Sequence, residues 1–438
     1  MTYQNTIEYL YEHLPMFTRV GQAAYKKDLH NTIALLDALD NPHKAFKSIH
    51  IAGTNGKGST SHMLAAVFHK AGYKTGLYTS PHLYDFRERI KVSGKDGLQM
   101  VPEEFVIAFT KKLKPLIEEI GPSFFEVTVA MAFEWFAVQK VEMAIVETGL
   151  GGRLDSTNVI LPELSIVTNI AWDHITLLGD SLDKIAWEKA GIMKKAVPVV
   201  IGETLPETKP VFEQKADDCR SEILYAENKF SITTLKPGIE QISLALRNQT
   251  TGEVENVTCD LPGIYQQSNI RTVFTALQQL RKQGWALSNG HVHEALQQVK
   301  QLTGLGGRWQ VIGHKPYVVL DVAHNEAGMV ELLKQIARLK DELNISKVHI
   351  VMGMVRDKEI DKVLGLLPPG YQYYFTQAQM PRAMPCTDLQ EKAAGFNLKG
   401  EAFLKPESAL INAKSMASEN DLIIICGSVF VVAEIPIS

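Results

Sequence analysis

The sequence predicts an α/β protein of two domains, each a mostly parallel sheet flanked by helices. Short apolar runs alternate with helical patterns over most of the 438 residues, which is typical of a sheet covered on both faces. The runs are continuous rather than alternating, as expected of strands buried on both sides. A glycine-rich linker at 303–307 separates two such series, so we expect one domain at 1–302 and a smaller one at 303–438.

The first series opens with a predicted strand at 47–53, followed by a glycine-rich turn and a helix that ends at Gly72. Residues 222–262 are polar and threonine-rich, which predicts a small antiparallel excursion. The other strands expected before the linker are 74–79, 143–147, 164–169 and 197–202, and the other helices are 102–119, 123–139, 266–283 and 290–301. After the linker we expect strands at 317–322, 348–353, 371–376 and 422–426, and helices at 326–340, 358–367, 387–395 and 407–417.

The composition is that of an ordinary globular protein. The chain is 45% hydrophobic and 21% charged, with a net charge of -4, so it lacks the basic excess of a protein that coats nucleic acid. The four cysteines show no C-x-x-C spacing and are predicted to be reduced thiols. No apolar run approaches the ~18 residues of a membrane span, and the first residues lack the apolar core of a signal peptide. We therefore expect a cytoplasmic monomer that binds neither nucleic acid nor membrane.

The strongest local signal is a glycine-rich turn between a predicted strand and a predicted helix. It reads Gly53-Thr54-Asn55-Gly56-Lys57-Gly58-Ser59-Thr60. Its glycines allow several N–H groups to converge on phosphate oxygens, and the helix N-terminus adds partial positive charge. Lys57 can reach the β- and γ-phosphates, and the Ser59 hydroxyl can meet Mg²⁺. The strict G-x-x-x-x-G-K-[ST] pattern is not met, so a turn without ligand is the alternative; we favour phosphate binding.

This turn resembles the nucleotide loop of the Mur ligase superfamily, and specifically of its folate branch, the folylpolyglutamate and dihydrofolate synthases. Further segments resemble that family's motifs in the same order. They are T-S-P-H-L from Thr79, E-T-G-L-G-G-R-L-D-S-T-N from Glu147, D-H at 173–174, E-K-A-G-I at 188–192, G-R at 307–308 and D-V-A-H-N at 321–325. The resemblance implies a P-loop-type ATPase domain at 1–302 and a Rossmann-like glutamate ligase domain at 303–438.

The resemblance also implies an ATP-driven ligation in which an acceptor carboxylate is phosphorylated and glutamate then displaces the phosphate. It implies ATP contacts from Asn55, Gly56, Lys57, Gly58, Ser59, Thr60, Asn269, Arg308 and Asp321, and Mg²⁺ ligands from Ser59, Ser80, Glu147, His174 and Lys189. The implied catalytic residues are Lys57, Lys189 and His324, and Lys189 matches a lysine that takes up CO₂ as a carbamate. Read without the family, His174 is a loop histidine and Lys189 a solvated helical lysine. Glu147 ends a predicted strand, where a carboxylate suits Mg²⁺.

The implied acceptor contacts fall in three segments. They are Pro81, His82, Ser123, Phe124, Phe125, Leu154, Asp155 and Ser156. Phe124 and Phe125 can stack on a flat pterin, although two core phenylalanines on a helix are the alternative. Asp155 suits the amino-pyrimidinone edge of a pterin, because a carboxylate accepts two parallel N–H bonds.

The resulting hypothesis is an ATP-dependent acid–amino-acid ligase that joins L-glutamate to dihydropteroate and to folates. The G-G-R-L-D form of the loop at 151–155 favours both activities. Three alternatives remain: a folylpolyglutamate synthase only, a Mur-type ligase with a UDP-linked muramyl acceptor, and a nucleotide-binding switch without ligase activity. Only about 46 residues precede the first predicted strand, which disfavours a separate UDP-binding domain. The presence of Lys57, Glu147, His174 and Lys189 disfavours the switch.

Overall fold

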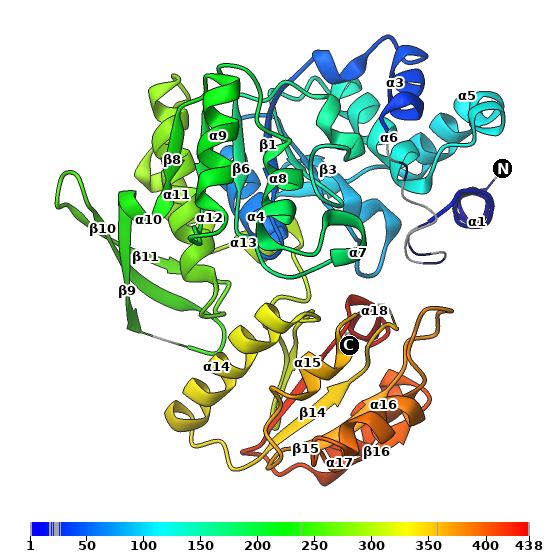
Figure 1. The fold of residues 1–438 in the computed structure, drawn as a ribbon, viewed down its shortest axis with the longest axis vertical. Coiled ribbons are helices and arrows are strands. Elements are labelled where there is room, and N and C mark those ends of the chain that lie inside the picture. Colours follow the sequence, from blue (N-terminus) through cyan, green and yellow to red (C-terminus); the bar gives the residue numbers. More distant parts are fainter. Residues whose placement is uncertain are drawn as a thin grey trace. The chain divides into compact units, whose positions relative to one another are not determined.

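The computed structural model describes residues 2–16, 19, 21, 26, 28–236, 238–356 and 358–436. The chain forms two compact units. The first comprises Met1–Leu235, Ser243–Asp260 and Gln266–Leu305, and the second comprises Lys236–Ile242, Leu261–Tyr265 and Gly306–Ser438. Their main junction, between Leu305 and Gly306, lies within the glycine-rich stretch at which the sequence places the domain boundary (Figure 1).

The first unit is organised around an eight-stranded sheet with the order β4-β3-β2-β5-β1-β6-β7-β8. The strands are β1 (Lys47–Ala52), β2 (Thr75–Tyr78), β3 (Ile90–Ser93), β4 (Leu98–Met100), β5 (Met143–Glu147), β6 (Leu164–Val167), β7 (Val199–Ile201) and β8 (Ile223–Tyr225). The six strands from β2 to β8 in this order are parallel, as predicted. Strands β3 and β4 add an antiparallel edge that the sequence analysis did not predict.

Helices cover both faces of this sheet. Ala144 and Val146 of β5 lie in one apolar cluster with residues of α5 and α6, so the period of two turns Met143 and Ile145 to the opposite face. Helix α4 is buried from Ser59 to Phe68 and contacts β5 as well as α11 and α12. The helices are α1 (Tyr3–His13), α3 (His30–Asp37), α4 (Lys57–Lys70), α5 (Glu103–Ile120), α6 (Phe124–Val138), α7 (Ile175–Leu178), α8 (Leu182–Ala190), α9 (Lys209–Cys219), α10 (Ala226–Lys229), α11 (Gln266–Lys282), α12 (Asn289–Leu296) and α13 (Val299–Thr303).

Two element predictions in this unit were wrong in part. The antiparallel segment expected at 222–262 begins later than predicted. The first part of this range, β8, pairs in parallel with β7 and belongs to the main sheet. The excursion itself is a three-stranded sheet of β9 (Phe230–Lys236), β10 (Ile242–Asn248) and β11 (Val254–Cys259), whose short connections require antiparallel neighbours. The helix expected at 290–301 is two helices, since the Asp260 carboxylate accepts the N–H of Lys300 at 2.9 Å and caps a new start.

The second unit contains a six-stranded sheet with the order β12-β13-β17-β14-β15-β16. All its strands are parallel except β12, an antiparallel edge. The strands are β12 (Gln310–His314), β13 (Tyr317–Leu320), β14 (Val348–Met352), β15 (Gln372–Thr376), β16 (Gly400–Phe403) and β17 (Leu422–Cys426); the helices are α14 (Glu326–Glu342), α15 (Ile360–Leu364), α16 (Cys386–Ala394), α17 (Pro406–Met416) and α18 (Val429–Ala433).

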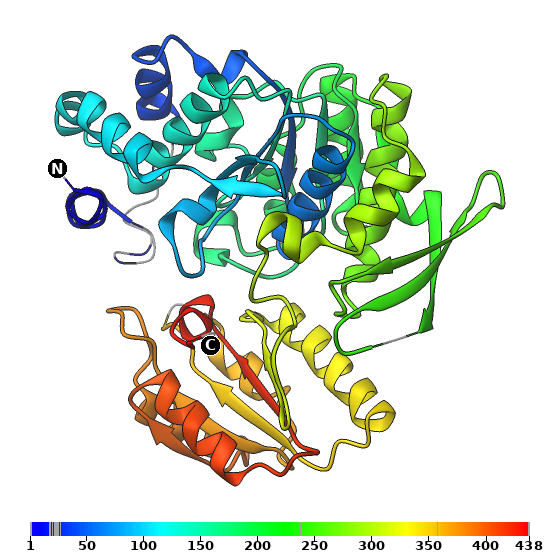
Figure 2. The same cartoon turned by 180° about the vertical axis from the view of Figure 1, so that it is seen from behind.

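From β13 to β16 the chain adds strands toward one edge of the sheet, and after β16 it returns to place β17 between β13 and β14. Right-handed crossovers therefore place α17 on the face opposite α14, and Figure 2 shows these helices on the two sides of the sheet. Both units are thus α/β layers around mostly parallel sheets, and the predicted fold class is confirmed. Among the described helices, none combines the length and apolar character that crossing a bilayer requires.

Candidate functional site

The glycine-rich turn joins β1 to α4 and is held in a shape that only glycine can adopt. Gly53 and Gly56 have φ angles of 149° and 83°. A Cβ at Gly53 would lie 1.9 Å from Thr168 Oγ1, and one at Gly56 would lie 2.2 Å from Asn269 Oδ1. The first N–H groups of α4 have no acceptor within the helix, so the turn presents them to a ligand at its positive end. This is the backbone arrangement of a phosphate site.

The end of β6 fixes the other half of the turn. Asn169 accepts the N–H of Thr54 at its backbone oxygen (3.0 Å) and the N–H of Asn55 at Oδ1 (2.9 Å). Thr168 Oγ1 donates to the carbonyl of Asn55 at 2.6 Å. The N–H of Asn55 is therefore used inside the protein, and the cradle for phosphate begins at Gly56. The sequence analysis missed Thr168 and Asn169; their signal was two polar residues placed directly after a buried parallel strand.

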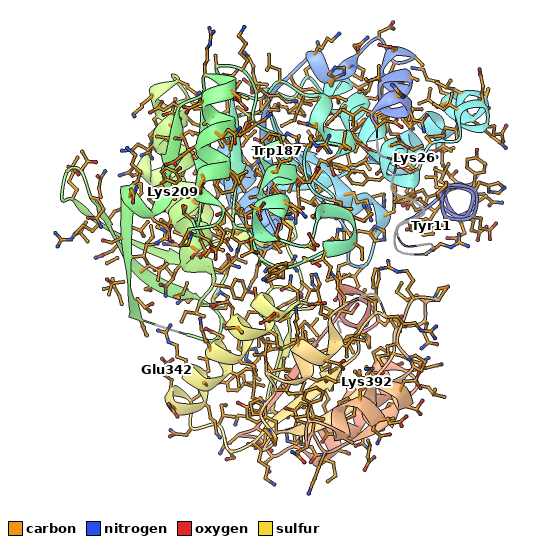
Figure 3. All side chains as sticks on the ribbon, viewed as in Figure 1. Tyr11, Lys26, Trp187, Lys209, Glu342 and Lys392 are labelled. Carbon is orange, nitrogen blue, oxygen red and sulfur yellow. The ribbon has the colours of Figure 1, made fainter. Side chains whose placement is uncertain are left out.

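Two lysine ammonium groups meet at the carbonyl of Gly53. Lys57 Nζ donates to the oxygens of Gly53 and Thr54, both at 3.1 Å, and Lys189 Nζ donates to Gly53 at 2.8 Å. Lys189 is only 4% exposed, so it is not the solvated helical lysine that its local sequence suggests. Trp187, two residues earlier on α8, faces outward and is 40% exposed (Figure 3). The helix thus turns Lys189 toward the phosphate turn.

The loop after β5 packs on the end of α8 and explains why its glycines are needed. A Cβ at Gly152 would lie 2.8 Å from the Lys189 carbonyl oxygen. The N–H of Arg153 donates to the carbonyl of Glu188 at 2.7 Å, and its guanidinium pairs with the Glu188 carboxylate at 2.8 Å. The segments at 147–158 and 188–192 therefore form one substructure that sets the position of Lys189.

The candidate metal ligands lie at the carboxyl ends of neighbouring strands. Glu147 ends β5, is 5% exposed and accepts the N–H of Ser80 at Oε2 (3.2 Å). Ser59 lies in the first turn of α4 and is buried, whereas the His174 side chain is 24% exposed. Within the described residues there is no group of three or more His, Cys, Asp or Glu side chains that could hold a metal alone. One carboxylate with hydroxyl oxygens fits Mg²⁺, which takes its remaining ligands from phosphates and water.

The candidate acceptor residues occupy different environments. Phe124 is 2% exposed and lies in the apolar core, where the Arg89 guanidinium covers its ring at 5.2 Å. Phe125 is half-buried, and its ring packs against Gly149. A Cβ at Gly149 would lie 2.5 Å from Phe125 Cζ. The Ser123 hydroxyl caps α6 by accepting the N–H of Glu126. The core alternative therefore describes Phe124, while Phe125 lies against the loop after β5.

His82 and the exposed Pro81 follow Ser80 in the connection after β2. His82 Nδ1 accepts from Arg89 Nε at 2.8 Å, and its Nε2 lies 3.3 Å from the Tyr11 hydroxyl. Burial lowers the pKa of His82 to about 3, so its ring is neutral. A neutral acceptor of this kind contributes shape and hydrogen bonding to the segment rather than charge.

Asp155 is almost fully buried and organises its own loop, beside the half-buried Leu154 and the buried Ser156. Its Oδ2 accepts the N–H of Leu150 at 2.8 Å, and its Oδ1 accepts the N–H of Thr157 at 3.0 Å and the Thr157 hydroxyl at 2.5 Å. Burial raises the pKa of Asp155 more than these bonds lower it. The backbone of Gly149 also hydrogen-bonds this carboxylate and lowers its pKa, so the roughly four lone-pair sites of an ionised carboxylate are taken up within the loop.

Replacing Asp155 by alanine should lower the free energy of unfolding by about 1–3 kcal/mol, because two buried N–H groups lose their acceptor. Urea unfolding of the purified protein measures this change. Asp218→Ala, at an exposed position of α9, is the control and should change stability little. Equal stability of Asp155→Ala and the wild type would contradict the organising role.

The candidate nucleotide residues of the second unit cluster at the end of β13. Asp321 Oδ2 accepts the Tyr265 hydroxyl and the N–H of Trp309, each at 2.9 Å, and Oδ1 accepts the N–H of Ala323 at 2.9 Å. Burial raises the pKa of Asp321, and the neighbouring Arg308 charge opposes that rise. His324 Nδ1 lies 2.9 Å from the carbonyl of Val322, so this nitrogen must carry the proton that it donates.

The sequence matches two family models over most of its length. Residues 51–277 match the Mur ligase middle domain, and residues 307–429 match the Mur ligase glutamate ligase domain. The dihydrofolate synthase/folylpolyglutamate synthase of Bacillus subtilis is 30% identical, over 99% of this chain and 98% of its own. Among solved structures, Escherichia coli FolC in complex with DHPP and ADP has a TM-score of 0.84 and 28% identity, over 99% of this chain and 96% of that one.

A third relative binds a metal. The bifunctional folylpolyglutamate synthase/dihydrofolate synthase of Yersinia pestis, complexed with AMPPNP and Mn ion, has a TM-score of 0.81 and 27% identity, over 99% of this chain and 97% of that one. These matches extend over both units and include the motifs that build the phosphate turn. The chain therefore belongs to the Mur ligase family of ATP-dependent ligases, in the branch that contains the folylpolyglutamate and dihydrofolate synthases.

Proposed function

We propose that the protein is a bifunctional ligase that joins L-glutamate to dihydropteroate and to the γ-carboxylate of reduced folates, with ATP as the phosphoryl donor and Mg²⁺ as the metal. One observation carries the proposal. The loop after β5 packs on Phe125 at one glycine and on the Lys189 helix at another, so it connects the acceptor segment with the phosphate turn. The relatives that contain DHPP, ADP, AMPPNP or Mn support the same ligands here. A cytoplasmic monomer is part of the proposal.

The first step joins two anions, so the protein must supply cations and hold the reactants in line. An oxygen of the acceptor carboxylate attacks the γ-phosphorus, and ADP leaves. In this step the ammonium of Lys57 moves from the carbonyls of Gly53 and Thr54 to the phosphates, and the first N–H groups of α4 hold the charge that develops. Ser59, Ser80, Glu147, His174 and a carbamylated Lys189 would hold Mg²⁺, which supplies charge neutralisation when bound.

In the second step the amine of glutamate attacks the acyl carbon, loses a proton and displaces inorganic phosphate. Water hydrolyses an acyl phosphate, so the site must exclude water while this intermediate is present. We assign the nucleotide contacts to Gly56, Gly58, Thr60, Asn269, Arg308 and Asp321, with Asn55 contributing through its position in the turn. His324 would face the nucleotide through Nε2, since Nδ1 donates to the carbonyl of Val322.

For the acceptor, we assign Pro81, His82, Ser123, Phe125, Leu154 and Ser156 to the wall of the pterin site. Phe124 would support Phe125 from the core rather than stack on the ligand. We assign Asp155 to the same site through the loop that its carboxylate holds in shape by its bonds to Leu150 and Thr157.

An amide-formation assay tests the proposal. Purified protein is given ATP, Mg²⁺, glutamate and one of three acceptors, which are dihydropteroate, tetrahydrofolate and a UDP-muramyl compound, and the products are read by mass. We expect a one-glutamate increase on dihydropteroate and on tetrahydrofolate, dependent on ATP. Product from tetrahydrofolate alone would reduce the function to a folylpolyglutamate synthase. Product from a UDP-muramyl acceptor only, or from no acceptor, would contradict the proposal.

A further inference from the structure

The first turn of α11 lies against the phosphate turn, and its first residue is entirely buried. Gln266 is 0% exposed, and both ends of its amide are used. Nε2 donates to the hydroxyl oxygen of Ser59 at 3.1 Å, and Oε1 accepts from Asn269 Nδ2 at 2.8 Å. These three side chains form one chain of hydrogen bonds that joins a candidate nucleotide contact to a candidate metal ligand.

This chain fixes the orientation of the Ser59 hydroxyl. A hydroxyl oxygen has two lone pairs and one proton, and Gln266 occupies one of the lone pairs. Asn269 determines which end of the glutamine faces Ser59, because it donates to Oε1 and so turns Nε2 the other way. Asn269 is itself held against Gly56, whose absent Cβ leaves the room for Oδ1. The second lone pair of Ser59 is thus directed by Gln266 and Asn269 of α11, with Gly56 of the turn leaving room for the Asn269 side chain.

A second set of contacts holds the same helix turn in place. Ser268 Oγ donates to Glu203 Oε1 at 2.7 Å, and Asn169 Nδ2 donates to Glu203 Oε2 at 3.2 Å. Asn169 in turn accepts the N–H of Asn55. The start of α11 is therefore connected to the phosphate turn at two places, at Ser59 through Gln266 and at Asn55 through Glu203 and Asn169. These contacts hold Gln266 in a fixed position.

We propose that Gln266 is a positioning residue that orients the Ser59 hydroxyl toward the Mg²⁺ of a bound Mg²⁺–nucleotide complex. The inference rests on the proposed role of Ser59 as a metal ligand. Residues that hydrogen-bond a metal ligand orient it and tune its affinity, and removing them costs 10–100-fold in metal affinity or activity as an order of magnitude. Gln266 couples metal binding to the helix that carries Asn269.

The test compares two buried glutamines of α11. Gln266→Met keeps the unbranched shape and removes both hydrogen bonds, and Gln279→Met is the matched control. Calorimetric titration with a non-hydrolysable ATP analogue, repeated over a series of Mg²⁺ concentrations, gives the Mg²⁺ needed for half-maximal nucleotide affinity. We expect this concentration to rise about 10–100-fold in Gln266→Met and to stay at the wild-type value in Gln279→Met. A Gln266→Met curve that overlays the wild type would overturn the proposal.

A double-mutant cycle separates positioning from a general loss of stability. If Gln266 acts through Ser59, then Ser59→Ala with Gln266→Met should need no more Mg²⁺ than Ser59→Ala alone. Additive effects would show that the glutamine acts elsewhere, and would overturn the proposal. Should Gln266→Met fail to fold, Gln266→Leu takes its place in both measurements. Neither measurement uses folate or glutamate, so a failure of the acceptor assay would leave this result interpretable.

Discussion

Replacing Lys57 by alanine is expected to lower the rate of ATP-dependent ligation by more than about 10³-fold while the protein stays folded. The ammonium group is the cation that the turn places at the positive end of α4, and its removal leaves the charge on the transferred phosphoryl group uncompensated. The fold should survive, because Lys57 is half-buried and its Nζ donates to two carbonyls of the turn itself, Gly53 and Thr54.

Initial rates of amide formation at saturating ATP measure the effect, and the thermal unfolding midpoint reports the fold. Lys70→Ala is the matched control, since Lys70 ends the same helix far from the turn. Its rate should equal that of the wild type. Turnover by Lys57→Ala within about tenfold of the wild type would remove the phosphate role from this lysine and with it the proposed first step.

The second large effect is expected at Lys189. Lys189→Ala should lower the rate by about 10²–10⁴-fold, with partial recovery on addition of formate or acetate. In carbamylation the ammonium group first loses one proton. The neutral amine then adds to the carbon of CO₂ and releases a second proton, so a buried cation is replaced by an anion. A small carboxylate can occupy the space that alanine leaves and restore that charge. The burial of Lys189 beside Gly53 provides the enclosed space on which such a rescue depends.

Lys184→Ala controls for the loss of a lysine from the same helix, because Lys184 is exposed and its ion pair with Asp180 lies at the surface. It should keep full activity. Rescue of Lys189→Ala by methylamine instead of a carboxylate would show that the group acts as a cation, and the carbamate would be abandoned. Full activity of Lys189→Ala would exclude any catalytic role.

The sequence predicted those parts of the fold whose signal is local and periodic. The buried parallel strands and the glycine turn are of this kind, since each is encoded by a continuous run of residues. The antiparallel edges were missed because β3 and β4 are short and mixed in polarity, with Lys91 inside β3. The start of α13 depends on Asp260, which lies 40 positions before Lys300. No pattern within the helix itself could reveal that break.

The candidate site divides in the same way. Lys57 and Ser59 lie in one motif, so their proximity was predictable from the chain. Gln266 reaches Ser59 across 207 positions, and Asn169 reaches Asn55 across 114, so only the folded structure brings them together. Burial also changed the interpretation of single residues. Phe124, which we expected to contact the acceptor, lies in the core, and Lys189, whose local sequence alone indicates a solvated helical lysine, is buried.

The roles proposed for the site residues all require that the acceptor carboxylate is phosphorylated before glutamate attacks it. Transfer of a heavy oxygen isotope tests this directly. Tetrahydrofolate labelled in its γ-carboxylate is turned over with ATP, Mg²⁺ and glutamate, and the released inorganic phosphate is analysed by mass. We expect one labelled oxygen in each phosphate, because the attacking oxygen leaves with the phosphorus. Phosphate without label, formed together with the amide product, would contradict an acyl phosphate and the mechanism built on it.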